Sequence, residues 1–265
     1  MDRRVSGPLF FNKHTSRNRV NPMTIKILKS LQEIDTSREE LRRMGISSIT
    51  PLSIRALRRL RVLGGVNVGD HVKSWDILET TRFLRNSLPK DAPILDIGAY
   101  ASEILCVLHR LKYNSLTGVD LNPALTSMPH SETIRYVVSD FLQTPFPDGS
   151  FAAITAMSVI EHGLQSSLLL KEISRLLCPG GYFIASFDYW PEKISTHGIT
   201  LFGMEWTIFS RDELIRFTKE ASSYGFSTDD KASLDAGDKV IHWGGRDYTF
   251  GWMVLRKTLK CAFSS

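Results

Sequence analysis

Short apolar runs alternate with amphipathic stretches through the middle of the chain. The apolar runs predict five strands, over 93–97, 115–120, 134–139, 151–157 and 181–187. Helical periodicity fills the gaps over 102–111 and 167–178. Because the runs are apolar on both faces and are separated by helices, the pattern indicates a parallel sheet covered on both sides, a doubly wound α/β domain. In such a sheet, ligands bind beyond the carboxyl ends of the strands.

Helical periodicity marks three shorter segments before residue 66. Apolar residues recur at helical spacing over 25–34, and Ser37 with Glu40 has the form of a capping box that starts a second helix. Thr50, followed by a proline, predicts the start of a third helix, which glycines at 64–65 end. The first part of the chain is therefore expected to be helical.

Charge separates the same two regions. The chain carries a net charge of +5, but residues 1–90 contain 18 of the 33 Lys and Arg and only 8 of the 28 Asp and Glu. The remainder, 91–265, is therefore acidic. Residues 1–23 are polar and show no period, as expected of an irregular arm. The prediction is a basic arm and helical cap over 1–90 and a second domain over 91–265.

Arginines concentrate on the third of these helices, at Arg55, Arg58, Arg59 and Arg61. They could neutralise the phosphates of a nucleic acid, or they could form a solvated face. No aromatic residue is interleaved with them as a platform on which bases could stack. The pattern therefore favours the solvated face over a nucleic-acid partner.

Composition narrows the class of protein further. Apolar residues make up 42% and charged residues 23%, as in ordinary globular domains. No run approaches the length of a membrane span and no signal-peptide core follows the first residues, so the expectation is a cytoplasmic protein. The three cysteines, Cys106, Cys178 and Cys261, are far apart and are expected to be buried thiols. No set of potential ligands has tight spacing, which predicts no metal site, although Asp140 and Asp188 could converge on a divalent ion.

Polar residues follow the first three strands of the predicted sheet. Gly98 permits a tight turn after the first strand, but Tyr100 stands where a dinucleotide fingerprint needs its second glycine. Asp120 ends the second strand, where a carboxylate can accept both hydroxyls of a ribose. Asp140 and Phe141 follow the third strand, where they could bind the amine and the face of a base. A single Asp at a strand end usually caps a turn, but the set indicates a nucleoside site without a diphosphate.

Five stretches carry a resemblance to a known family. They are ILDIGAYASE at 94–103, GVDLNP at 118–123, SDF at 139–141, AITAMSVIEHG at 153–163 and LLCPGGYFIASF at 176–187. In this order and spacing the chain resembles class I S-adenosylmethionine-dependent methyltransferases of the small-molecule group. The resemblance implies a Rossmann-like sheet, mostly parallel with an antiparallel last strand, plus an N-terminal helical extension.

The resemblance also implies S-adenosylmethionine as cofactor and a set of residues that bind it. The turn after the first strand would line the methionine part, and the ends of the next two strands would hold the ribose and the adenine. The implied set is Asp96, Gly98, Ala99, Tyr100, Asp120, Leu121, Asp140, Phe141 and Ser158. Tyr100 and Ser102 stand where the family usually has glycines.

Acceptor residues are expected after the fourth and fifth strands. His162 could act as a general base, because imidazole titrates near neutrality, or it could cap a helix. Asp188, with Tyr189 and Trp190, could bind the acceptor or pack the chain reversal. Trp75 could cover the pocket or belong to the core. His162 and Asp188 are therefore the candidate catalytic residues, and the three aromatic residues are the candidate substrate-binding residues.

The sequence predicts an enzyme that transfers a methyl group to a small-molecule acceptor, such as a secondary metabolite or a sugar, by in-line displacement. Two alternatives stay open. The basic N-terminal helices could recruit an RNA or protein acceptor. Tyr100 and Ser102 could mark a non-catalytic protein that binds S-adenosylmethionine. The oligomeric state is not indicated by the sequence.

Overall fold

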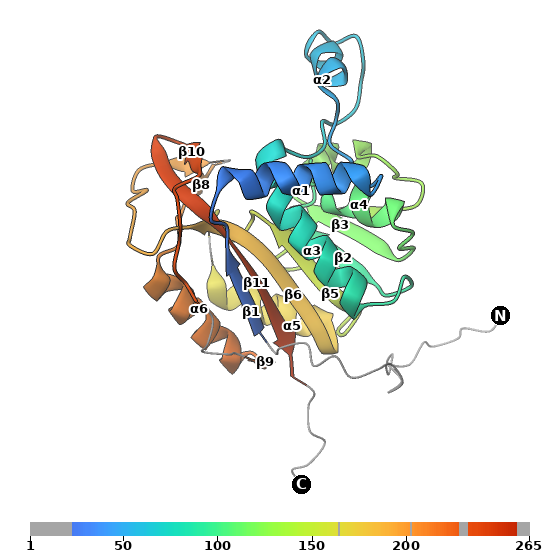
Figure 1. Ribbon diagram of the computed structural model, residues 1–265. Coiled ribbons are helices and arrows are strands. Elements are labelled where there is room, and N and C mark those ends of the chain that lie inside the picture. The colour runs from blue at the N-terminus through green and yellow to red at the C-terminus, as the bar shows by residue number, and fades with distance from the viewer. Residues whose placement is uncertain (1–22, 164, 202, 228–232, 259–265) are drawn as a thin grey trace, which may run out of the picture.

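The structure is a computed structural model in which residues 23–163, 165–201, 203–227 and 233–258 are described. Its centre is a mixed sheet with the strand order β1-β11-β6-β5-β2-β3-β4 (Figure 1). These strands are β1 (Met23–Ile27), β2 (Ile94–Ile97), β3 (Leu116–Asp120), β4 (Arg135–Val138), β5 (Phe151–Met157), β6 (Leu177–Tyr189) and β11 (Arg246–Lys257). Strands β2 to β6 are parallel, and β11 runs antiparallel to β6. The predicted fold class, with its antiparallel last strand, is confirmed.

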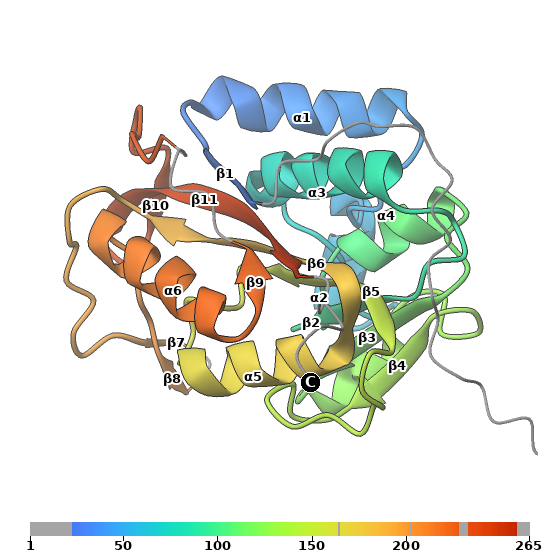
Figure 2. The same ribbon diagram turned by 90° about the horizontal axis from the view of Figure 1, so that it is seen from below.

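Helices cover both faces of the sheet (Figure 2). On one face lie α1 (Leu31–Arg43), α3 (Ser74–Ser87) and α4 (Ile104–Arg110), and on the other lie α5 (Ser166–Leu176) and α6 (Arg211–Ser223). The helix α2 (Leu52–Arg59) stands apart from both layers. The shorter elements are η1 (His71–Lys73), η2 (Pro123–Ser127), β7 (Thr200–Leu201), β8 (Met204–Glu205), β9 (Phe226–Ser227) and β10 (Ile241–Trp243).

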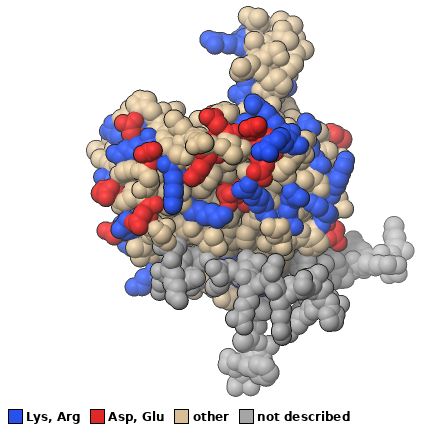
Figure 3. Space-filling view, in the orientation of Figure 1, with Lys and Arg blue, Asp and Glu red and all other residues tan. Residues whose placement is uncertain are grey.

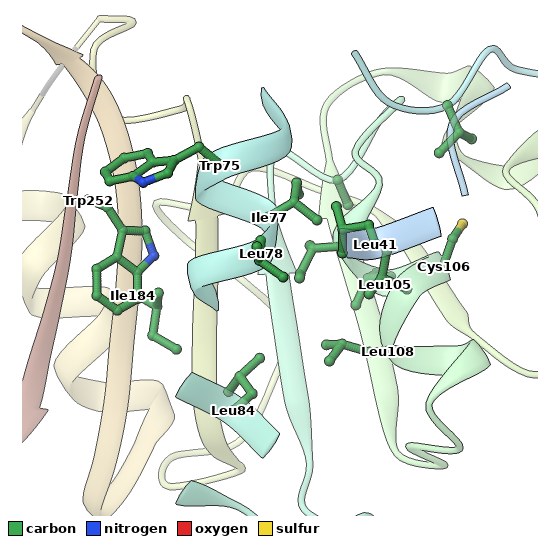
Figure 4. Packing of buried hydrophobic residues seen from close by; sticks show 14 of the residues in the cluster. Leu41, Trp75, Ile77, Leu78, Leu84, Leu105, Cys106, Leu108, Ile184 and Trp252 are labelled. Carbon is green, nitrogen blue, oxygen red and sulfur yellow. The ribbon is translucent and has the colours of Figure 1, made fainter. Parts of the chain in front are cut away.

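Two hydrophobic cores result from the alternation of side chains along the strands. In β6, Ile184 belongs to the core under α3 and α4, while its neighbours Phe183 and Ala185 belong to the core under α5 and α6. Figure 4 shows the first core, where Trp75 of α3 lies beside Trp252 of β11. Successive residues at the end of a strand therefore face opposite layers of helices, which decides which of them can reach one site.

The N-terminal region differs from its sequence pattern. The helix expected over 25–34 is wrong, because Met23–Ile27 forms β1, antiparallel to the outer edge of β11. The separate helix expected from Ser37 is also wrong, since Ser37 is buried within α1. An apolar spacing of two to three residues fits either period, and the open edge of β11 selects the strand. The arm expected over 1–23 lies outside the described residues except for Met23.

The predicted division at residue 90 remains a prediction as a domain boundary. In the structure, β1 extends the sheet of the second region, and α3 packs on that sheet. Cys106 and Cys178 are free buried thiols, and Cys261 lies outside the described residues. No helix in the described part of the chain is long and apolar enough to cross a membrane.

Candidate cofactor and acceptor site

The turn after β2 is closed by contacts that leave room only for glycine at position 98. Gly98 has a φ of +68°, and a Cβ atom there would overlap the side chain of Val159. Further along the turn, Ala101 takes the positive φ of +62° that a glycine would adopt more easily. The backbone NH of Tyr100 donates to Asp120 Oδ2 at 3.0 Å. Tyr100 therefore does not prevent the turn, and it ties the ends of β2 and β3 together.

Asp96 is the most deeply buried acid of this turn. Its Oδ1 accepts a hydrogen bond of 2.6 Å from Thr155 Oγ1, and its side chain is fully buried. Its Oδ2 has no hydrogen-bond partner among the described residues, although the Ser102 hydroxyl lies nearby. Burial raises the pKa of Asp96 to about 7. A buried acceptor without a donor is a place where a ligand can bind.

Further residues predicted to bind the cofactor lie at the carboxyl ends of the next two strands, β3 and β4. Asp120 is half-buried and also accepts from Asn122 NH at 2.8 Å. Leu121 beside it is 61% exposed, so its apolar side chain is open to a ligand. Asp140 is exposed, accepts from Leu142 NH at 2.8 Å, and adjoins the half-buried Phe141. These carboxylates keep free acceptor capacity, and the set fits a nucleoside with an ammonium group near Asp96.

A second group of charges lies after β5 and β6, around Lys73. This residue ends η1, and its ammonium donates to Ser158 Oγ and lies 3.6 Å from the centre of the Phe250 ring. Ser158 has a φ of +54°, a strained conformation for a residue with a side chain. Lys73 also lowers the pKa of Asp76, which burial nevertheless raises to about 6. The group therefore links the start of α3 to the end of β5.

Asp188 and Glu161 place two more buried carboxyl groups beside Lys73. Asp188 Oδ2 accepts a hydrogen bond of 2.8 Å from the indole of Trp206, and burial raises its pKa. Glu161 is fully buried, and both burial and the neighbouring Asp188 raise its pKa. Its Oε2 has no hydrogen-bond partner among the described residues. One ammonium therefore faces several buried carboxyl groups whose pKa values burial raises.

His162 follows Glu161 and is a neutral base in this setting. Burial, and secondly the charge of Lys73, lower the pKa of its imidazole to about 4. The backbone of His162 also pairs with that of Trp206 in an isolated antiparallel β-bridge. The long connection after β6 is therefore packed against the site through Trp206, which is 2% exposed.

Two of the three aromatic residues predicted to bind substrate lie elsewhere. Trp75 lines a hollow of about 720 Å³ together with residues of β1 and α1. Tyr189 belongs to the core on the far face of the sheet, where its hydroxyl donates to the Leu234 carbonyl at 2.7 Å. Trp190 is half-buried, with the ammonium of Lys239 4.7 Å from its ring centre. Of the substrate-side residues, Asp188 and His162 both contact Trp206, whereas Trp75 and Tyr189 lie apart from them.

Sequence reasoning missed most of the group around Lys73. Lys73 and Asp76 are separated by more than 80 residues from Ser158 and Glu161, so spacing could not connect them. The sequence indicated this group only weakly. Lys73 and Asp76 are three positions apart at the start of a helix and flank Trp75, which was predicted to bind substrate.

The central segment of the chain is similar in sequence to known proteins. Residues 95–185 match the family model described as a methyltransferase domain. Cycloartenol-C-24-methyltransferase of Arabidopsis thaliana is 31% identical over 93 residues, which are 35% of this chain and 27% of that protein. A 2-methyl-6-phytyl-1,4-hydroquinone methyltransferase of Synechocystis is 26% identical over 106 residues, 38% of this chain and 33% of that protein. The chain thus spans a third or less of the length of these relatives.

Solved structures of methyltransferases resemble the chain over a longer stretch at low identity. A SAM-dependent methyltransferase of Methanosarcina mazei is 17% identical and covers 67% of this chain and 98% of its own, with a TM-score of 0.49. The match over 95–185 contains Asp96, Gly98, Asp120, Asp140 and Ser158. The segment 95–185 of this chain is therefore similar to methyltransferase domains, including those of relatives that act on small molecules.

Proposed function

We propose that this protein transfers a methyl group from S-adenosylmethionine to a small-molecule acceptor. The observation that carries the proposal is the series of carboxylates at three successive strand ends, Asp96, Asp120 and Asp140, within the matched domain. The small-molecule part is supported by the relatives, which are named for cycloartenol and for a phytyl hydroquinone.

On the cofactor side, the residues present fit the group. Asp96 Oδ2 would accept from the ammonium of the methionine part, and Asp120 would accept the ribose hydroxyls. Leu121 and Phe141 would pack on the adenine, beside Asp140. When bound, S-adenosylmethionine supplies an electrophilic methyl group on a sulfonium with a good leaving group. The protein then contributes mainly by positioning the acceptor, which can supply several kcal/mol.

On the acceptor side, the group around Lys73 can handle a proton. The imidazole of His162 is unprotonated at pH 7, because its pKa is lowered to about 4, and it would accept a proton from a hydroxyl or amine acceptor only as a weak base. Asp188, held by the Trp206 indole, can orient a donor group of the acceptor. The ammonium of Lys73 offsets part of the repulsion between the buried carboxyl groups around it.

Calorimetry with S-adenosylhomocysteine tests the proposal. The wild type should bind, and Asp120→Ala should bind roughly 10- to 100-fold more weakly, because two charge-assisted hydrogen bonds are lost. Asp91→Ala is the matched control, because Asp91 is exposed and precedes β2 at the opposite edge of the sheet. Absence of binding by the wild type would refute the cofactor assignment. If the protein bound the cofactor but transferred no methyl group to any of a panel of hydroxylated and aminated small molecules, it would be a non-catalytic protein that binds S-adenosylmethionine.

A further inference from the structure

The segment 50–69 forms a hairpin that projects from the body of the protein. It consists of α2 and the loop that returns from it, and Figure 1 shows it standing clear of both helix layers. Its base is fixed by the backbone hydrogen bonds from Thr50 NH to Val68 O and from Gly69 NH to Ala101 O, both 2.9 Å. Since Ala101 belongs to the turn after β2, the hairpin lies near the carboxyl ends of the parallel strands, where the candidate site is.

The helix of this hairpin turns its leucines outward. Leu52 is 84% exposed at the start of the helix, and Leu60, which directly follows its last residue, is 72% exposed. Val62 at 65% and Leu63 at 42% continue the apolar surface into the loop. None of the residues of α2 is buried. A helix that packs on a core shows the opposite arrangement, so this apolar surface is available to a partner.

Two of its arginines hold the hairpin together. Arg55 donates to the carbonyls of Thr50 and Val68 at 3.0 and 3.1 Å, and also to that of Gly69. Arg58 donates to the carbonyls of Gly64 and Val66 at 3.0 and 2.6 Å. The projecting shape is therefore supported internally, and it does not depend on a partner.

The charge of the segment defines what it can bind. No residue from Leu41 to Gly69 is acidic, while the hairpin contains four arginines, of which Arg59 and Arg61 are exposed. In Figure 3 the projection is largely uncharged, with basic groups at its side and base. A convex surface that combines exposed leucines with positive charge is complementary to the interface of an anionic lipid bilayer. A protein partner would instead need an acidic groove shaped around the helix.

We infer that the hairpin 50–69 docks the protein on the surface of anionic membranes. Leu52, Leu60 and Val62 enter the interface, and Arg59 and Arg61 bind lipid phosphates. The docked molecule turns the edge of the sheet with the candidate site toward the bilayer. This inference does not depend on methyl transfer, because docking is measured without cofactor or acceptor.

Vesicle co-sedimentation of the full chain tests it. The wild type should bind vesicles of phosphatidylcholine and phosphatidylglycerol in equal amounts, and bind phosphatidylcholine alone much more weakly. Arg59→Gln with Arg61→Gln should weaken binding about fivefold per charge removed. Leu52→Asp with Leu60→Asp should weaken it roughly tenfold or more. All four residues are exposed, so circular dichroism should show the same fold as the wild type.

Matched controls lie on α5, on the other face of the sheet. Leu168 is 47% exposed and Lys171 is exposed, so Leu168→Asp and Lys171→Glu change the same properties away from the hairpin. These variants should bind vesicles like the wild type. Equal loss in the controls, or no binding by the wild type, overturns the inference. Sedimentation velocity showing a dimer that Leu60→Asp dissociates would assign the surface to a second copy, and would overturn it as well.

Discussion

The buried position of the Asp96 carboxyl group favours its protonated form. It is fully buried at the end of β2, where its Oδ1 accepts a hydrogen bond from the Thr155 hydroxyl. The folded-state pKa is about 7, against an ordinary value of 3.8. At neutral pH this acid is therefore partly ionised, and a bound ammonium group or a higher pH favours its charged form.

This difference predicts how stability depends on pH. Between pH 4 and 7 the folded protein retains the Asp96 proton while the unfolded chain has released it, so raising the pH lowers the free energy of unfolding. Over this range, the Asp96 proton makes the free energy of unfolding fall by roughly 1 kcal/mol per pH unit. Asp96→Asn removes this dependence, so the stability of this variant relative to the wild type should improve as the pH rises through this window. Urea unfolding at several pH values measures the difference.

Asp91→Asn is the control for this measurement, because Asp91 is exposed. Its stability relative to the wild type should show little change over the same pH range. A difference between Asp96→Asn and the wild type that is independent of pH would contradict the assignment of a raised pKa to Asp96.

At the scale of elements, one buried ion pair joins α1 to the start of α4. The two guanidinium NH2 groups of Arg38 donate to both carboxylate oxygens of Glu103 at 2.8 Å, and both side chains are buried. Arg38 also donates to Ser74 Oγ at 2.9 Å, and Ser48 NH donates to Glu103 at 2.7 Å. The pair therefore connects the N-terminal helices with the turn that carries Gly98.

Removing one partner of this pair should be costly. Glu103→Gln leaves the buried charge of Arg38 unbalanced and should lower the free energy of unfolding by about 3–5 kcal/mol. The double variant Arg38→Met with Glu103→Met should lose less, because no charge is left buried. Urea unfolding measures both variants.

An exposed pair supplies the comparison. Asp235, which pairs with Arg211 at 2.8 Å, has a side chain that is 81% exposed. Asp235→Asn should cost less than about 1 kcal/mol. If Glu103→Gln cost no more than Asp235→Asn, the pair would not be the connection described here.

At the scale of the whole molecule, the N-terminal region completes the sheet. The strand β1 pairs with β11 over Met23–Ile27, and Leu28 continues the contact through its NH, which donates to the Phe250 carbonyl at 2.9 Å. The Thr249 hydroxyl donates to the Leu28 carbonyl at 2.7 Å. The two regions that differ in charge therefore share one sheet.

Deleting residues 1–29 should expose the edge of β11. An unpaired and apolar edge strand pairs with other chains, so the shortened protein should self-associate or precipitate. Light scattering and size-exclusion chromatography measure this. A chain that lacks only residues 1–22 retains β1 and should elute like the wild type. A monodisperse protein after the longer deletion would show that β1 is dispensable.

How much could be predicted from the sequence depended on the distance between the residues involved. The strands from β2 to β6 follow from apolar runs, and the start of α6 is marked by Ser210 and Glu213, which form a capping box in the structure. The strand β1 was missed, because five residues cannot by themselves distinguish the two periods when the deciding partner lies more than 200 residues away. Lys73 was missed for the same reason, since its role depends on Ser158.

The sequence by itself determined the doubly wound sheet, the order of its strand-end carboxylates and the resemblance of its central segment to methyltransferase domains. These properties depend on local periodicity and on residues within one turn of a strand end. The tertiary structure decided that Tyr189 faces away from Asp188, that Lys73 lies among buried acids, and that the leucines of α2 face solvent. The physical reason is that side-chain direction and burial are set by packing between distant segments, which no local pattern encodes.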